Sequence, residues 1–335
     1  MENIKILGAI YATTNHRVNT DTDMLFIIAL SYFSSVFPTH THAPAPAPTQ
    51  HVPSGLSAVL DLSKHKRISP DTYHVGRRQH PHKKDAFVDG YAFLNLHRRA
   101  SSAHKIHRDK HHHFKRNLTT HEHISSHTQH RELYASLPTC TGPIAEGAAW
   151  HLARGYQLHT LNRNGMTKQF VVDAVQRAND AWSCGMSTFD RFVLGPLLGV
   201  VDESSGTVIN TNEPDGVNEI GFASIQGHEG TVAVTIVWGV LDGPLQDRVI
   251  VEFDMIFDGE HYQWGDGAVD RSKMDLQAIC THETGHRLGL DDIYDAQCSD
   301  VTMFGTSAEG EIDKRTLTQK DVGGLSFLYG LLSLW

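Results

Sequence analysis

One short segment limits the possible folds of this chain more than any other. It runs from Ser272 to Asp292 and reads SKMDLQAICTHETGHRLGLDD. Ser272 and Asp275 fit a capping box, and apolar residues follow at helix-compatible positions, namely Met274, Ala278, Ile279 and Leu288. The segment is therefore predicted to be a helix that begins at Ser272 and ends at Gly289, where a residue without a Cβ atom can turn the chain sharply.

The polar residues of this predicted helix have the spacing of a metal site. His282 and His286 lie four residues apart, so both imidazoles can point at one ion, and zinc suits such a pair. Glu283 is offset by about 100° around the helix axis, where it can reach a water molecule on the metal without binding the metal itself. The turn at Gly289 is expected to bring Asp292 back toward the same point.

The stretch HETGHRLGLDD resembles the metzincin zinc-peptidase signature HExxHxxGxx(H/D). It is similar to the matrixins, which usually have His at the last position, and to snapalysin-like proteases, which have Asp there. The resemblance implies that His282, His286 and Asp292 bind one catalytic zinc ion. It also implies that Glu283 is the general base for the water that attacks the peptide bond, and that Met303 forms the methionine turn beneath the metal.

The resemblance covers roughly the last 190 residues, a span that suits one domain. It implies an α+β fold with a mixed, mostly parallel twisted sheet, an active-site helix and a C-terminal helix, and an edge strand that pairs with extended substrates. Apolar periodicity predicts helices from Thr167 to Gly185 and from Thr318 to Tyr329. It predicts strands within 150–161, 206–212, 218–225, 231–239 and 248–257.

Three other interpretations of the motif stay open. The two histidines could be a buried pair without function on an ordinary amphipathic helix. The third ligand could be a Glu from a later segment, as in thermolysin-type sites, with Glu309 or Glu311 in that place. The domain could also be a catalytically silent module that contains zinc and binds a partner through its cleft, although an intact Glu283 disfavours this.

The first 37 residues are predicted to be a signal-peptide-like segment. Residues 24–37 form an apolar run of fourteen, MLFIIALSYFSSVF, which is short for a membrane span and long enough for a signal-peptide core. The polar lead before it is unusually long, so Met24 is an alternative start to Met1. A buried helix is the competing interpretation. If the segment is a signal, the protein is secreted and is not anchored in a membrane.

Residues 38–136 are predicted to be a disordered pro-region or linker. This segment has fifteen Lys or Arg against seven Asp or Glu, a net charge of +8, whereas residues 137–335 have twelve against twenty-eight, a net of −16. The first segment also contains seventeen His and the second six. Such asymmetry favours a basic arm that binds and inhibits the acidic catalytic domain of the same chain. The protein is expected to be a monomer. Nucleic-acid binding is disfavoured because interleaved aromatic residues are lacking. Zinc buffering around His111, His112 and His113 and a merely solvated tail stay open.

Two features of the arm would matter in a secreted protein. Lys115-Arg116 is the dibasic pair nearest the catalytic domain, where a processing protease could cut. Asn117-Leu118-Thr119 is a glycosylation acceptor pattern.

The even number of cysteines, four, favours disulfides in an oxidising compartment. Cys280 is predicted to point away from the metal and to pair with Cys298, which leaves Cys140 and Cys184 as a second pair. Alternatively, the sequence around Cys140 faintly resembles the matrixin cysteine switch, which caps the zinc in a zymogen.

An acidic loop precedes the active-site helix and contains Asp258, Glu260, Asp266 and Asp270. A structural calcium ion there would match the resemblance, but the spacing is not that of an EF-hand, and a solvated loop is the favoured interpretation. Substrate preference does not follow from the sequence.

Overall fold

The computed structural model describes residues 59–98, 140–144, 148–150, 154–185, 194–201, 209–244 and 247–332. All of them belong to one compact unit, Gly55–Trp335. The signal-like segment 1–37, Lys115-Arg116, Asn117 and the three consecutive histidines 111–113 lie outside the described residues. Within the described ranges, no helix is long and apolar enough to cross a membrane.

The centre of the fold is a mixed sheet whose main path has the order β2-β3-β4-β8-β9-β7-β5-β6. β9, β7, β5 and β6 run parallel to one another, whereas β2, β3, β4, β8 and β9 pair antiparallel in that order. The strands are β2 (Lys66–Arg67), β3 (Thr72–Gln79), β4 (Phe87–His97), β5 (Arg154–His159), β6 (Leu194–Val201), β7 (Glu219–Gln226), β8 (Thr231–Val240) and β9 (Val249–Asp258). The mixed α+β architecture is confirmed, with a larger antiparallel part than expected.

Four short strands complete the described strands. β1 (Val59–Asp61) pairs with β7, and β12 (Thr306–Ser307) pairs with β4. β10 (Trp264–Gly265) and β11 (Met274–Asp275) form a separate two-stranded ribbon just before the motif helix.

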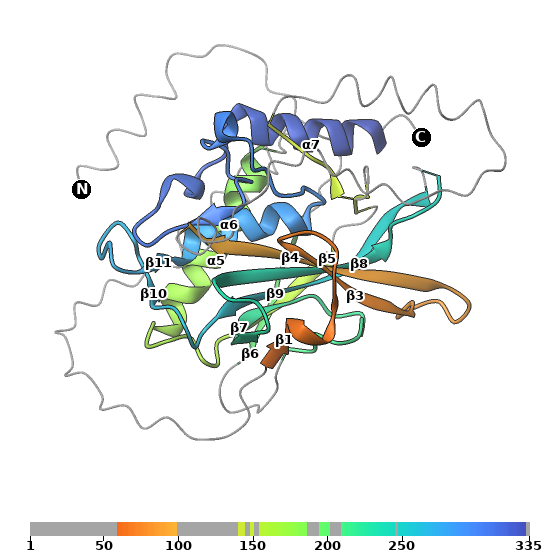
Figure 1. Cartoon of the computed structure of the whole chain (residues 1–335), viewed down its shortest axis with the longest axis horizontal. Helices are drawn as coiled ribbons and strands as arrows, with labels where there is room; N and C mark the ends of the chain where they lie inside the picture. The colour runs from red at the N-terminus through yellow and green to blue at the C-terminus, as the bar shows by residue number, and fades with distance from the viewer. Residues whose placement is uncertain are drawn as a thin grey trace, which may run out of the picture. The chain divides into compact units, whose positions relative to one another are not determined.

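The three α-helices among the described residues pack on one face of this sheet: α5 (Lys168–Gly185), α6 (Leu276–Arg287) and α7 (Gln319–Leu332) (Figure 1). Apolar residues of all three join one core with one face of the sheet, for example Trp182 of α5, Ile279 of α6 and Leu328 of α7. α5 and α6 also pack directly against each other. The helices therefore hold the motif segment against the middle of the sheet.

The prediction that residues 38–136 are disordered is wrong for residues 59–98. β3 and β4 are full members of the sheet, and β4 pairs with β8 along Asp89–Leu96. Alternate residues of these strands build a second core on the other sheet face, among them Tyr73, Val75 and Leu94. The alternation is present in the sequence of these strands of eight and eleven residues, but the basic, His-rich composition of residues 38–136 as a whole favoured disorder in the prediction.

Two boundaries in the predicted catalytic part also differ. Residues 209–212 form no strand, and the strand on the side of β5 opposite β7 is instead β6, whose LGPLLGVV sequence has little alternation. The motif helix begins at Leu276, after Asp275, whereas Ser272 lies in a turn in which it donates to Asp270. Asp275 was predicted as the capping-box partner of Ser272, but it is itself the N-cap residue of the helix.

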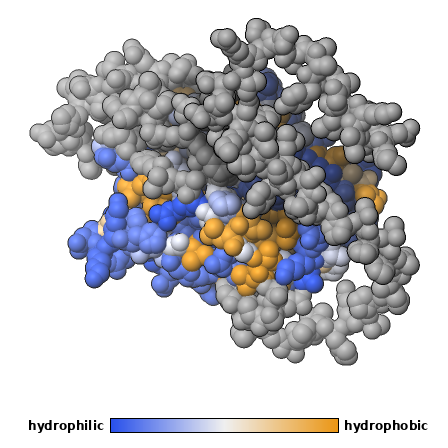
Figure 2. Space-filling model, turned by 180° about the vertical axis from the view of Figure 1, so that it is seen from behind, coloured by the Kyte–Doolittle hydropathy of each residue, from blue (hydrophilic) through white to orange (hydrophobic). Residues whose placement is uncertain are grey.

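Where Figure 2 shows described residues, hydrophilic areas lie beside a central apolar patch and smaller apolar areas toward both sides. The large apolar side chains that are exposed are Val59, Ile68, Phe87, Leu198, Val269 and Ile312.

Candidate metal centre

Both ends of α6 are fixed by residues that also set the position of the motif. At its start, the buried Asp275 accepts a hydrogen bond from the Ala278 amide at 2.8 Å, and the Arg315 guanidinium pairs with the same carboxylate. At its end, Gly289 has a φ of +96°, its N–H donates to His286 O, and the Leu290 N–H donates to Gly285 O. This is a Schellman arrangement, so the predicted turn at Gly289 is present.

The two histidines of α6 present their outer nitrogens to one point. His282 Nδ1 donates to the Thr302 carbonyl and His286 Nδ1 to the Leu290 carbonyl, both at 2.8 Å. Because a carbonyl can only accept, these bonds place the ring protons on Nδ1 and leave both Nε2 lone pairs free. Burial lowers the pKa of His282 well below its usual value and that of His286 to about 4, so both rings are neutral, as ligands must be.

The turn brings Asp292 to the same point. Its carboxylate oxygens lie 3.2 Å from His282 Nε2 and 3.5 Å from His286 Nε2, and its side chain is only 1% exposed. Burial raises the pKa of Asp292 to about 7; the neighbouring His286 lowers it and the nearby Asp71 raises it. Among the described residues, His282, His286 and Asp292 are the one group of three or more His, Cys, Asp or Glu residues whose ligand atoms all lie within 4.8 Å of one another.

The unpaired polar atoms at this point fit a divalent cation. His282 Nε2, His286 Nε2 and both Asp292 carboxylate oxygens are buried and have no hydrogen-bond partner. Leaving such groups unpaired in the interior costs about 1–3 kcal/mol each. Two neutral imidazoles and one carboxylate are a donor set that zinc accepts, with a position left open. A zinc ion would therefore satisfy all the unpaired ligand atoms at once.

Glu283 lies beside this group, fully buried, with one oxygen held and one free. Its Oε2 accepts a hydrogen bond from the Thr235 hydroxyl of β8 at 2.6 Å, while Oε1 has no partner. Burial raises the pKa of Glu283 to about 8, against the Thr235 bond and a smaller effect of the Asn95 amide, which lower it. The sequence did not indicate Thr235, because a single Thr within a strand looks like any β-branched strand residue.

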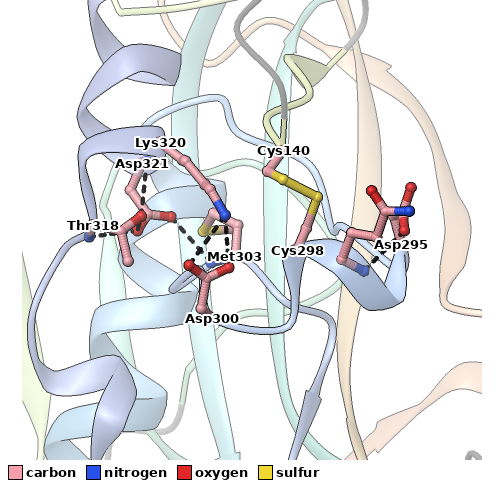
Figure 3. Close-up of a disulfide and its surroundings, with 9 residues drawn as sticks. Cys140, Asp295, Cys298, Asp300, Met303, Thr318, Lys320 and Asp321 are labelled. Carbon is pink, nitrogen blue, oxygen red and sulfur yellow. Dashed lines mark hydrogen bonds and ion pairs between the residues drawn. A yellow bond between two sulfur atoms is a disulfide. The ribbon is translucent and has the colours of Figure 1, made fainter.

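The predicted methionine turn lies directly against α6. Met303 is buried, and a Cβ atom at Gly285 would collide with its Sδ atom, so α6 and the turn can approach closely only because Gly285 has no side chain. Asp321 of α7 holds the turn by accepting from the Thr302 amide at 3.1 Å. It also accepts from the Met303 amide at 3.4 Å (Figure 3). Thr318 and Asp321 also form the predicted capping box of α7.

The predicted Cys280–Cys298 pairing is wrong. Cys298 is bonded to Cys140, with the Cα atoms 5.4 Å apart (Figure 3). Cys280 is a free, fully buried thiol. Cys280 lies in the core, with its Sγ atom 4.0 Å from Met255 Sδ. The bond also excludes the two other roles expected for Cys140 in this structure, a partner for Cys184 and a thiolate cap on the metal.

The other candidate ligands are engaged elsewhere. Glu309 pairs with His97 at 2.9 Å and Glu311 with Arg98 at 2.8 Å, so neither takes the place of Asp292. The four acidic residues considered for calcium also have partners of their own: His261 for Asp258, Ser224 for Glu260, Arg315 for Asp266 and Ser272 for Asp270. They do not form a metal-binding group among the described residues.

The segment that carries this centre is similar to a known protein family. Residues 219–330 match the family model described as Matrixin, a span that begins at β7 and ends within α7. No curated protein matches the chain. Among solved structures, the chain is similar to metalloproteinase-II from Bacteroides fragilis at 10% sequence identity, covering 78% of each chain with a TM-score of 0.30. A TM-score of this size supports no conclusion about fold or function.

Proposed function

We propose, from the matrixin metallopeptidase domain that residues 219–330 form, that this protein is a secreted zinc-dependent endopeptidase. The observation that carries the proposal is the convergence of three unpaired buried ligands, His282, His286 and Asp292, beside a carboxyl group with one free oxygen. An extracellular location is supported by the Cys140–Cys298 disulfide and by the signal-like apolar run at residues 24–37.

The residues divide the work of peptide hydrolysis among them. Zinc, when bound by His282, His286 and Asp292, polarises the scissile carbonyl and makes a water molecule more acidic. Glu283 accepts the proton of the attacking water through its free oxygen Oε1 and then transfers that proton to the leaving amine. Thr235 fixes the other oxygen, so the carboxyl group keeps one orientation through both proton transfers.

The supporting residues keep the ligands in place. The carbonyls of Thr302 and Leu290 orient the two imidazoles, and Asp321 fixes the turn that carries Thr302. Hydrogen bonds that orient metal ligands in this way typically contribute about 10–100-fold to metal affinity or activity. The alternative of a silent zinc-containing module is disfavoured, because Glu283 is present and has a free oxygen beside the three ligands.

Casein digestion by the zinc-loaded chain tests the proposal. The chain is assayed intact and also after limited trypsin cleavage between residues 98 and 140 and removal of the trypsin. Both forms are assayed with and without a chelator, and Glu283→Gln is assayed in parallel. We expect the chelator to abolish digestion, added zinc to restore it, and Glu283→Gln to lower the rate by about 10²–10⁴-fold because the general base is lost. Digestion that survives the chelator, or full activity of Glu283→Gln, would show that the assignment is wrong.

A further inference from the structure

The edge of the matrixin domain is occupied by a strand from outside that domain. Within residues 219–330, β8 is the last strand of the sheet, but in the whole chain β4 pairs with it from Asp89 to Leu96. β4 belongs to the N-terminal segment 59–98, which the family match does not include. A sheet edge beside a peptidase site is where an extended peptide can add as a further strand through backbone hydrogen bonds.

β4 also covers the metal centre with its side chains. Because successive residues of a strand point to opposite faces, Phe93 and Asn95 face α6, whereas Leu94 joins the core behind the sheet. The Phe93 ring stacks on the His286 ring, with centroids 5.1 Å apart and planes 20° apart. Asn95 lies beside the Glu283 carboxyl, fully buried and without a well-formed hydrogen bond.

The resulting site is sealed from solvent. His282, Glu283 and His286 each have a relative exposure of 0%. The residue before β3, Asp71, is held to β4 because its carbonyl accepts the Leu94 N–H at 2.9 Å, and its charge acts on Asp292. The N-terminal segment therefore closes the site from the β4 side, and a peptide substrate cannot reach Glu283 while β4 is in place.

We infer that β4 occupies the peptide-binding edge of the enzyme as an internal strand, so that the chain is latent in this conformation and becomes active when β4 leaves β8. This inference rests on the proposed peptidase function and adds a mode of inhibition to it. It differs from a cysteine switch, because the blocking groups are the strand backbone and the Phe93 ring, and Cys140 is bonded to Cys298.

Two features of the chain fit a removable strand. The disulfide joins residues 140 and 298, so no described covalent bond other than the main chain through residues 99–139 ties β4 to the matrixin domain. The buried Asn95 amide costs stability in the closed form, since an unpaired buried polar group is unfavourable. Because the strand belongs to the same chain, its effective concentration is high, on the order of millimolar or more, and it competes strongly with substrate.

A pair of variants in the full zinc-loaded chain tests the inference. Phe93→Ala removes the ring over His286, and Phe87→Ala is the matched control, because Phe87 lies on the same strand but is 54% exposed. The measurements are turnover of a fluorogenic peptide and zinc-dependent binding of acetohydroxamic acid. We expect Phe93→Ala to raise both by about tenfold or more, since a buried Phe contributes strongly to packing, and Phe87→Ala to change neither.

A reversible disulfide between β4 and β8, called the lock below, makes the test independent of folding defects. Leu94 and Val234 are direct partners across β4 and β8, and opposite residues of such a pair have Cα separations of about 4.5–5.5 Å, within disulfide range. Adding Leu94→Cys and Val234→Cys to Phe93→Ala should return turnover and hydroxamate binding to the wild-type level on oxidation. Mild reduction should release them, and Phe93→Leu replaces Phe93→Ala if the latter does not fold.

The outcomes separate the latency from the peptidase function. If wild type and the Phe93 variant turn over peptide and bind hydroxamate equally, or if the oxidised lock stays fully active, the latency is overturned while the peptidase function stands. If no form hydrolyses peptide but hydroxamate binding follows the lock as expected, β4 covers the site as inferred and the peptidase function fails.

Discussion

Two clusters of buried carboxyl groups lie on opposite faces of the same sheet, and they differ in how their oxygens are satisfied. The front cluster lies on the sheet face that α6 covers and consists of Asp292 and Glu283 beside the two histidines. The rear cluster lies on the other face, on β7 and β9, and consists of Glu219, Glu252 and Asp254, of which Glu219 and Asp254 are direct partners.

The rear cluster is mostly satisfied by the protein itself. Glu252 accepts from the amides of Asp215 and Gly216, and Glu219 accepts from the Asn210 amide at 2.9 Å and pairs with His159 at 2.7 Å. Only Asp254 keeps both oxygens unpaired, and burial raises its pKa well above the usual value. One isolated carboxyl group can be accommodated by taking up a proton.

The front cluster has no such solution. Lone pairs on three different residues face one point, and two of them belong to imidazoles whose other nitrogen already carries the proton. A single cation satisfies all three, whereas one proton on Asp292 could reach only one of the two imidazoles and would leave the other Nε2 unpaired. The comparison shows that burial of carboxyl groups alone does not indicate a metal site, and that convergence of unpaired ligand atoms does.

A large effect on turnover is expected from Thr235→Val, which removes the hydroxyl that holds Glu283. A hydrogen bond to a charged group is worth about 1.5–3 kcal/mol, so turnover should fall by about 10–100-fold with unchanged zinc content. The assay uses the Phe93→Ala background, in which substrate is expected to reach the site.

The matched control is Thr231→Val on the same strand, whose hydroxyl donates to the His228 carbonyl and not to Glu283. It should leave turnover within about twofold of the parent. Equal losses in the two variants would mean that Thr235 acts only through the stability of β8.

A smaller effect is expected at the rear cluster from Asp254→Asn. The folded-state pKa of Asp254 is raised above its unfolded value, so between the two the folded state binds more protons, and stability falls as pH rises through that window. Glu252, whose pKa burial raises to about 7, adds a loss between about pH 4.5 and pH 7.

Urea unfolding between pH 5 and pH 8 measures this slope. Asp254→Asn should lower it by up to about 1.4 kcal/mol per pH unit and should leave zinc binding unchanged. Glu213→Gln, at an exposed carboxyl, is the control for the loss of one acidic group. An unchanged slope in Asp254→Asn would mean that Asp254 is charged in the folded protein and has a partner.

The part of the molecule from α6 to α7 was largely predictable from sequence, because its structure depends on residues close together in the chain. His282, Glu283, His286 and Gly289 are positioned by helix geometry and a turn, both of which follow from spacing. Asp292 and Met303 lie where the family resemblance places them, and the closing helix begins at its predicted cap. The start of the motif helix was predicted about one turn too early, at Ser272. Both Ser272 and Asp275 are good N-cap residues, and in the structure Asp275 is the cap.

The features that could not be derived depend on long-range pairing. The partner of Cys298 is 158 residues away in the chain, and spacing along a helix cannot select it. β4 has the right alternation, but nothing local indicates that it pairs with β8, or that Phe93 stacks on His286. Thr235 likewise acquires its role only when β8 packs against α6.

The most direct test of the metal centre is a zinc titration of Asp292→Ala, with Asp254→Ala as the matched control. Both variants remove one buried carboxyl group from the same domain, but only Asp292 faces the two histidines. We predict one zinc ion per wild-type chain, an affinity lower by about a hundredfold or more in Asp292→Ala, and wild-type affinity in Asp254→Ala. Equal zinc affinity in wild type and Asp292→Ala would contradict the three-ligand site on which the proposed function depends.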